Sequence, residues 1–150
     1  TGGRLKRVAG YVRDDEALCF TYGDGLSDVD ITALVAFHRA HGRRATVTAV
    51  QPPGRYGALD MDDAAVRGFV EKPQGEAGWI NGGFFVLSPS CIDLVADDAT
   101  PWEGYPLREL AARGELMAFK HRGFWMPMDT LRDKNYLEAL WQSGKAPWRV

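Results

Sequence analysis

Phe20-Thr21-Tyr22-Gly23-Asp24-Gly25 ends a short apolar run and places one acid between two glycines. Residues 17–22 are typical of a buried strand, because the run is short, apolar and aromatic. The two glycines permit backbone angles that other residues resist, and they leave room for a ligand beside the main chain. Asp24 therefore stands at the carboxyl end of a predicted strand, where open α/β sheets bind their ligands. A carboxylate there can hold a divalent metal that carries phosphates. The alternative is an ordinary acidic turn.

Strand and helix signals alternate on both sides of this stretch. Asp30 can cap a helix over residues 31–41, and Gly42 can end it. Strands and helices interleaved in this way favour an α/β sandwich, with strands of mixed direction in the second half. Further strands are predicted over residues 45–50, 65–71, 79–87 and 116–121, and further helices over residues 5–12, 89–95, 107–112 and 131–141.

The bulk properties limit the class of protein. A length of 150 residues predicts one domain, residues 1–150, with its own core. A net charge of −2 and the lack of a long basic run argue against a nucleic-acid partner. The apolar stretches are too short to cross a membrane, and no secretory signal is visible. Cys19 and Cys91 lie in apolar segments and are predicted to be buried thiols rather than a disulfide, which suits the cytoplasm.

Two other patterns have both a chemical and a structural interpretation. His38 and His41 lie three positions apart on one predicted helix, but no cysteine or third histidine is nearby, so a helix-surface or helix-dipole role is favoured over a metal site. Asp28-Val29-Asp30 matches the acid-x-acid motif of metal-dependent glycosyltransferases. Because the motif directly precedes a helix, capping is the favoured interpretation.

Four segments place glycine or proline beside a charged or polar group at the end of an apolar strand. If these ends converge, the site contains Asp24, Asp129, Glu71, Lys72 and Asn81. Two acids can share one hard cation, and a lysine suits a phosphate. The set fits magnesium-assisted phosphoryl or nucleotidyl transfer, in which positioning and charge neutralisation dominate. The alternative is four unrelated loops. The segments are residues 22–25, 69–73, 79–85 and 123–130.

The sequence also contains five motifs in a fixed order: FTYGDG at 20–25, QPPGRYGAL at 51–59, EKP at 71–73, WINGGFF at 79–85 and FWMPMDTLRDK at 124–134. Together with the tail at 144–148, they resemble the glucose-1-phosphate cytidylyltransferases, which are sugar-nucleotide pyrophosphorylases. The resemblance implies a Rossmann-like mixed-sheet nucleotidyltransferase fold and a homo-oligomer. It also implies that CTP and α-D-glucose 1-phosphate give CDP-glucose and pyrophosphate, with Mg²⁺. In this family CDP-glucose supplies bacterial dideoxyhexose synthesis for the lipopolysaccharide O antigen.

The resemblance also implies roles for individual residues. Asp24 and Asp129 match the two acids that hold Mg²⁺, and together with Lys72 they form the catalytic set. Gly3 and Gly57 enter through the resemblance alone. The substrate-binding positions are Lys72 at the sugar phosphate, Glu71 at the glucose hydroxyls, Gly57 and Asn81 elsewhere in the sugar site, and Gly3 in a turn that approaches the nucleotide.

One departure from the family pattern affects nucleotide binding. Members of the family begin with a Gly-x-Gly-Thr-Arg loop and a Lys-Pro pair that hold the triphosphate, and residues 1–150 contain no such loop. The chain is therefore expected to be the C-terminal portion of such an enzyme, without the N-terminal part of the fold. Glycine-rich backbone amides cradle phosphates, so the isolated chain is expected to bind CTP poorly and to be a poor catalyst. The alternatives are an inactive binding or assembly fragment and a glycosyltransferase that uses Asp28 and Asp30.

Overall fold

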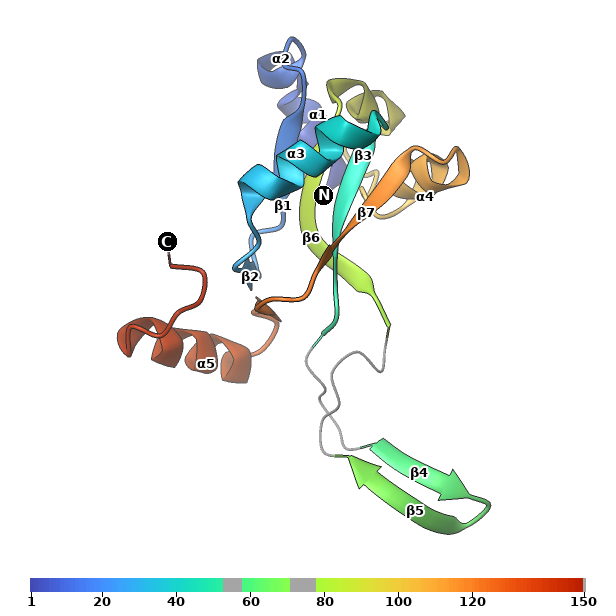
Figure 1. The fold of residues 1–150 in the computed structure, drawn as a ribbon. Helices are drawn as coiled ribbons and strands as arrows, with labels where there is room; N and C mark the ends of the chain where they lie inside the picture. The colour runs from blue at the N-terminus through green and yellow to red at the C-terminus, as the bar shows by residue number, and fades with distance from the viewer. Residues whose placement is uncertain (53–57, 71–77, 150) are drawn as a thin grey trace. The chain divides into compact units, whose positions relative to one another are not determined.

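The computed structural model describes residues 1–52, 58–70 and 78–149, which divide into two compact units (Figure 1). Unit 1 comprises Thr1–Gly23, Asp30–Thr48 and Gly83–Lys120. Unit 2 comprises Asp24–Val29, Ala49–Gly82 and His121–Val150. The expectation of one domain over residues 1–150 stays a prediction.

Unit 1 is built on a mixed four-stranded sheet, as the sequence predicts. Strand β6 runs antiparallel to β1, from Leu18 opposite Leu87 to Thr21 opposite Phe84. The Ser88 N–H donates to the Arg44 carbonyl over 2.8 Å, so the end of β6 lies beside the start of β3. These two strands are therefore antiparallel as well. The strand order is β1 (Leu18–Thr21), β6 (Ile80–Leu87), β3 (Ala45–Val50) and β7 (Leu116–His121).

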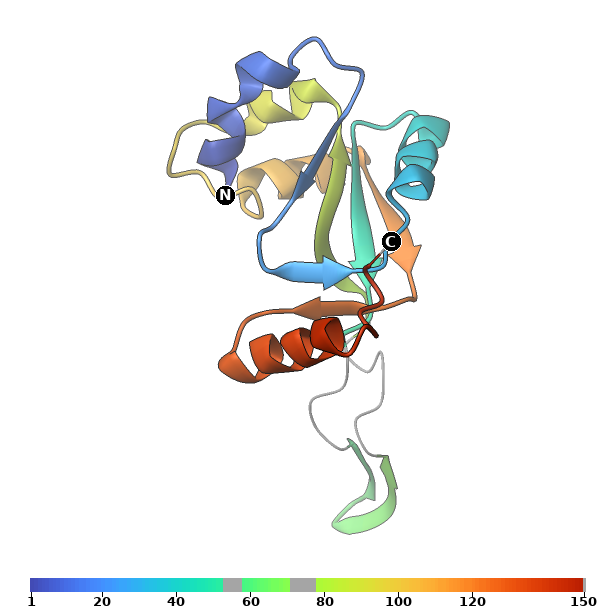
Figure 2. The ribbon, with the colours of Figure 1, turned by 90° about the vertical axis from the view of Figure 1, so that its left-hand side faces the viewer.

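Helices cover both faces of this sheet (Figure 2). One face carries α3 (Ile31–His41), which begins where the Asp30 carboxylate accepts from the Ala33 N–H over 2.9 Å. That helix ends at Gly42, whose φ of 64° is left-handed. The predicted helix over residues 5–12 is divided at Val8 into two short helices. The other face carries α1 (Gly2–Arg7), α2 (Ala9–Val12), the 3₁₀ helix η1 (Pro89–Leu94) and α4 (Tyr105–Ala112).

The core of unit 1 lies between the sheet and the helices α1, η1 and α4. Trp102 and Phe85 are its largest buried side chains, and their rings lie 5.9 Å apart. Cys91 is buried in this core, as expected, and burial raises the pKa of its thiol to about 11. The same expectation is wrong for Cys19, which is exposed. Strand β1 lies at one edge of the four-stranded sheet. Its side chains alternate along the strand, and those of Cys19 and Thr21 are exposed.

The described residues of unit 2 form two antiparallel strand pairs and one helix. The sequence does not predict β2, β4 or β8, and it predicts the strand over residues 65–71, which the structure describes up to Val70. The helix α5 begins with a capping box formed by Thr130 and Asp133. None of the helices in the described ranges is long and apolar enough to cross a membrane. The pairs are β2 (Gly25–Ser27) with β8 (Trp125–Pro127) and β4 (Ala58–Asp62) with β5 (Ala65–Val70), and the helix is α5 (Leu131–Gln142).

Candidate active site

The pairing of β2 with β8 brings the backbones of the two predicted metal ligands together. Asp24 directly precedes β2, and Asp129 follows two residues after β8. The Met128 N–H donates to the Asp24 carbonyl over 2.7 Å, which extends the strand pairing to the residue beside Asp129. Both acids are exposed, and both belong to unit 2. The convergence expected for these two segments is therefore present in the main chain.

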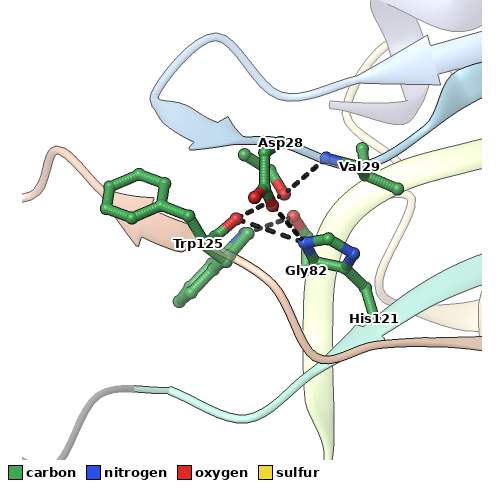
Figure 3. Close-up of polar contacts among 7 residues, drawn as sticks. Asp28, Val29, Gly82, His121 and Trp125 are labelled. Atoms are coloured by element: carbon green, nitrogen blue, oxygen red, sulfur yellow. Dashed lines mark hydrogen bonds and ion pairs between the residues drawn. The ribbon is translucent and has the colours of Figure 1, made fainter. Parts of the chain in front are cut away.

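Asn81 belongs to the same unit as the two acids. It is the second residue of β6, and it is exposed. The neighbouring Gly82 carbonyl accepts a hydrogen bond of 2.8 Å from the indole Nε1 of Trp125, on β8 (Figure 3). The start of β6 is thus attached to the β2–β8 pair. Trp125 was not singled out in the sequence, although it lies inside one of the four predicted segments.

Four other expected site residues have different outcomes. Glu71, Lys72 and Gly57 lie outside the described residues. Gly3 lies in α1 rather than in a turn, and it is buried in unit 1. A Cβ atom at this position would lie 2.6 Å from the Asp98 backbone, so packing alone requires glycine there. The assignment of Gly3 to the nucleotide stays a prediction.

The acids of the Asp28-Val29-Asp30 motif have structural partners. Asp30 caps α3, as the favoured interpretation predicts. Asp28 does not act as a cap: its Oδ1 atom lies 2.8 Å from Nε2 of His121 (Figure 3). His121 was not recognised in the sequence, and its one signal is a polar side chain at the end of a predicted strand. These contacts do not favour the glycosyltransferase alternative.

His38 and His41 share a partner inside unit 1 instead of lying on the helix surface. The buried hydroxyl of Thr46 lies 2.9 Å from Nδ1 of His38 and 2.7 Å from Nε2 of His41. A hydroxyl has one hydrogen, so at least one of the two rings must donate. Burial, followed by repulsion from His41, lowers the pKa of His38. Burial, followed by repulsion from Arg43, lowers the pKa of His41.

The donor set at the candidate site fits a hard cation that brings other ligands with it. Within the described part of the chain, no group of three or more His, Cys, Asp or Glu residues could hold a metal ion. Mg²⁺ does not need such a group, because it keeps several waters and is bound through one or two carboxylates plus substrate phosphates. Asp24 and Asp129 are residues of that kind: Asp24 directly precedes β2, and Asp129 follows Met128, whose N–H donates to the Asp24 carbonyl.

Comparison with known proteins agrees with the fold and with the motifs. Residues 4–139 match the nucleotidyl transferase family. The chain belongs to this family. It is 66% identical over 150 residues to the glucose-1-phosphate cytidylyltransferase of Salmonella typhi, a match that covers the whole chain and 58% of that protein. It is 38% identical over 151 residues to the probable glucose-1-phosphate cytidylyltransferase of Bacillus subtilis (strain 168), a match that covers the whole chain and 59% of that protein.

The solved structures agree with this assignment. The crystal structure of HddC from Yersinia pseudotuberculosis superposes with a TM-score of 0.66 at 26% identity, over 91% of this chain and 60% of that one. The chain thus spans less than two thirds of the length of each of these three proteins. Such a share does not by itself identify the matched part as their C-terminal portion.

Proposed function

We propose that the chain is part of a glucose-1-phosphate cytidylyltransferase, which forms CDP-glucose and pyrophosphate from CTP and α-D-glucose 1-phosphate. The observation that carries this proposal is the 66% identity, along all 150 residues, to the Salmonella typhi protein of that name. The chain spans 58% of that protein, so the activity and substrates of the whole enzyme belong to the proposal.

The reaction joins two anions, and the proposed residues hold them in place. A phosphate oxygen of glucose 1-phosphate bonds to the α-phosphorus of CTP, and the bond from that phosphorus to the oxygen leading to the β-phosphate breaks. The attacking oxygen is already ionised, so no strong general base is required. We assign Lys72 to the sugar phosphate as a point charge, and Glu71, Asn81 and Gly57 to the sugar. Holding the reactants in line is then the main contribution to the rate.

Asp24 and Asp129 are the residues that would hold Mg²⁺. When bound there, the ion would offset negative charge on the α-phosphate. The hydrogen bond between the Met128 N–H and the Asp24 carbonyl supports this assignment, since it brings the two acids to one end of the β2–β8 pair. Asp24→Asn and Asp129→Asn should each weaken Mg²⁺ binding at least tenfold in calorimetry. Asp93→Asn, a change at an exposed acid of η1, is the matched control and should have no effect.

The decisive experiment is a chimera. Residues 1–150 would replace the matching 150 residues of the Salmonella typhi relative, and pyrophosphate release would be measured with CTP, glucose 1-phosphate and Mg²⁺. We expect turnover in the ordinary enzymatic range of about 1–10³ s⁻¹. A folded chimera without turnover, or one that accepts another sugar phosphate in preference, would contradict the proposal. The unmodified relative is the positive control.

We also propose that the enzyme works in the cytoplasm as a homo-oligomer and supplies CDP-glucose for a bacterial surface polysaccharide. Both cysteines are free thiols, in agreement with a reducing compartment. Three large apolar side chains of α5 are exposed, as is common at interfaces between subunits. They are Leu131, Tyr136 and Trp141. Light scattering of the chimera would show a single-subunit mass if the oligomer is wrong.

A further inference from the structure

The strand pair that carries the two acids is short. β2 and β8 contain three residues each, and Leu26 lies opposite Met126 at the centre. The pairing ends with the Met128 N–H on the Asp24 carbonyl at one side and the Asp28 N–H on the Phe124 carbonyl, over 3.2 Å, at the other. An isolated two-stranded ribbon is marginally stable at best in water. The register of this ribbon must therefore be fixed by additional contacts.

One such contact closes the end of the ribbon that lies away from the acids. Nε2 of His121 lies 2.8 Å from Oδ1 of Asp28 (Figure 3). The same atom lies 3.3 Å from the Phe124 carbonyl oxygen. Both partners are acceptors, so this ring nitrogen is the donor. The His121 side chain is 12% exposed and the Asp28 side chain 34%, which shields the pair from solvent more than a typical surface ion pair. His121 thus joins the end of β2 to the start of β8.

Neighbouring groups show that this end is closely packed. The Ser27 hydroxyl donates to the same Phe124 carbonyl over 2.8 Å. A Cβ atom on Gly123 would lie 2.7 Å from Cε1 of His121 and 2.9 Å from its Nε2, closer than real Cβ contacts. A Cβ atom at position 123 would therefore force the side chains of the Asp28–His121 pair to shift.

The register of the ribbon controls the positions of the two acids. A slip of one residue moves a strand by about 3.3 Å and turns its side chains to the opposite face. Mg²⁺ accepts oxygen ligands at about 2.0–2.1 Å in near-ideal octahedral geometry. A shift of that size in either direction would move Asp129 relative to Asp24 by more than this geometry tolerates. We infer that Asp28 and His121 are positioning residues that fix the β2–β8 register and thereby the spacing of Asp24 and Asp129. This inference rests on the proposed function.

The test compares three variants with the unmodified protein. His121→Ala removes the donor, and His121→Gln keeps an N–H group that can reach Asp28. Lys134→Ala is the matched control, because it breaks the exposed Lys134–Glu138 ion pair of α5, also 2.8 Å long, in the same unit. Hydrogen exchange of the Met128 amide, measured by NMR in metal-free buffer, shows whether the end of the ribbon beside the two acids stays paired. Calorimetry with the Mg²⁺–CTP complex, compared with CTP alone, reports the two acids, and thermal unfolding checks that each variant is folded.

We expect His121→Ala to accelerate Met128 exchange and to weaken binding of the Mg²⁺–CTP complex, each at least tenfold. His121→Gln should recover most of both, and Lys134→Ala should change neither. Wild-type values in His121→Ala, or a Gln variant that is as impaired as the Ala variant, would overturn the inference alone. Faster exchange with unchanged affinity for the Mg²⁺–CTP complex would overturn the link to Asp24 and Asp129. If the unmodified protein does not bind the Mg²⁺–CTP complex more tightly than CTP alone, that link and the proposed metal site are both wrong.

Discussion

The Thr46 hydroxyl offers a quantitative test of how unit 1 holds α3 on its sheet. Thr46→Val keeps the shape of the side chain but removes the hydroxyl that contacts both His38 and His41. A buried polar group left without its partner costs about 1–3 kcal/mol. His38 is buried, so the loss of its hydrogen bond should have the full energetic effect. His41 is half-buried, so water can replace part of its lost hydrogen bond. We expect the free energy of unfolding to fall by about 2–3 kcal/mol in total.

The same strand supplies the control. Thr48 is as buried as Thr46, but its hydroxyl has no hydrogen-bond partner among the described residues. Thr48→Val should therefore leave the free energy of unfolding unchanged or raise it, since replacing an unsatisfied hydroxyl removes a desolvation cost. The two substitutions alter side chains of the same size on one face of β3. Their difference isolates the hydrogen bonds to the histidines.

Urea unfolding at pH 7.5 measures both variants. For a protein of 150 residues, the expected loss in Thr46→Val corresponds to a fall in Tm of roughly 4–12 °C. The slope of the unfolding free energy with urea should not change, because the surface exposed on unfolding is nearly the same. Equal losses in the two variants, or a larger loss in Thr48→Val, would refute the reasoning.

Three further predictions follow from particular residues. Burial lowers the pKa values of His38 and His41, so the unfolded chain takes up protons before the folded protein does as the pH falls below about 6.5. The free energy of unfolding, measured in urea titrations, should therefore be highest above that pH and fall toward pH 5, and the fall should be smaller in the double variant His38→Gln/His41→Gln. Gly123→Ala should lower the unfolding free energy by about 1–3 kcal/mol by overpacking, whereas Gly10→Ala in open space should be neutral or slightly stabilising in the same assay. In steady-state kinetics of the chimera, Lys72→Ala should raise the KM for glucose 1-phosphate and lower kcat. Lys72→Arg should be impaired less than Lys72→Ala but should not reach the wild-type KM and kcat, because a planar guanidinium differs from a point ammonium. Unchanged kinetics in Lys72→Ala would mean that Lys72 is only a surface charge.

The sequence predicts the elements whose signals are local. Helix α3 has its cap at Asp30 and its left-handed end at Gly42, both within the segment itself. Strand β3 has the predicted bounds, and the mixed direction of the sheet agrees with the alternation of elements along the chain. Such features depend on a few neighbouring residues, so they can be inferred before the tertiary structure is known.

Features that depend on distant partners were missed or wrongly assigned. The strands β2 and β8 are too short to show a periodic pattern, and each exists because of the other. The exposure of Cys19 depends on the position of β1 at a sheet edge, which its own residues do not reveal. The sequence favours a helix-surface or helix-dipole role for His38 and His41, because it does not show that Thr46 supplies a hydrogen bond to each.

The candidate site illustrates how pairing between strands outweighs distance along the sequence. Asp28 lies four residues from Asp24, which along an extended strand is about 13 Å. The oxygen ligands of one ion lie within about 2.0–2.6 Å of it, so these two acids do not suit a shared cation. Asp129 is far from Asp24 in sequence, yet the hydrogen bond from the Met128 N–H brings its backbone to the neighbouring position. The nearer acid instead bonds to His121 at the opposite end of the ribbon. The two acids of this segment thus lie at opposite ends of the ribbon, where we propose Asp24 for the metal and Asp28 for holding the strands in register.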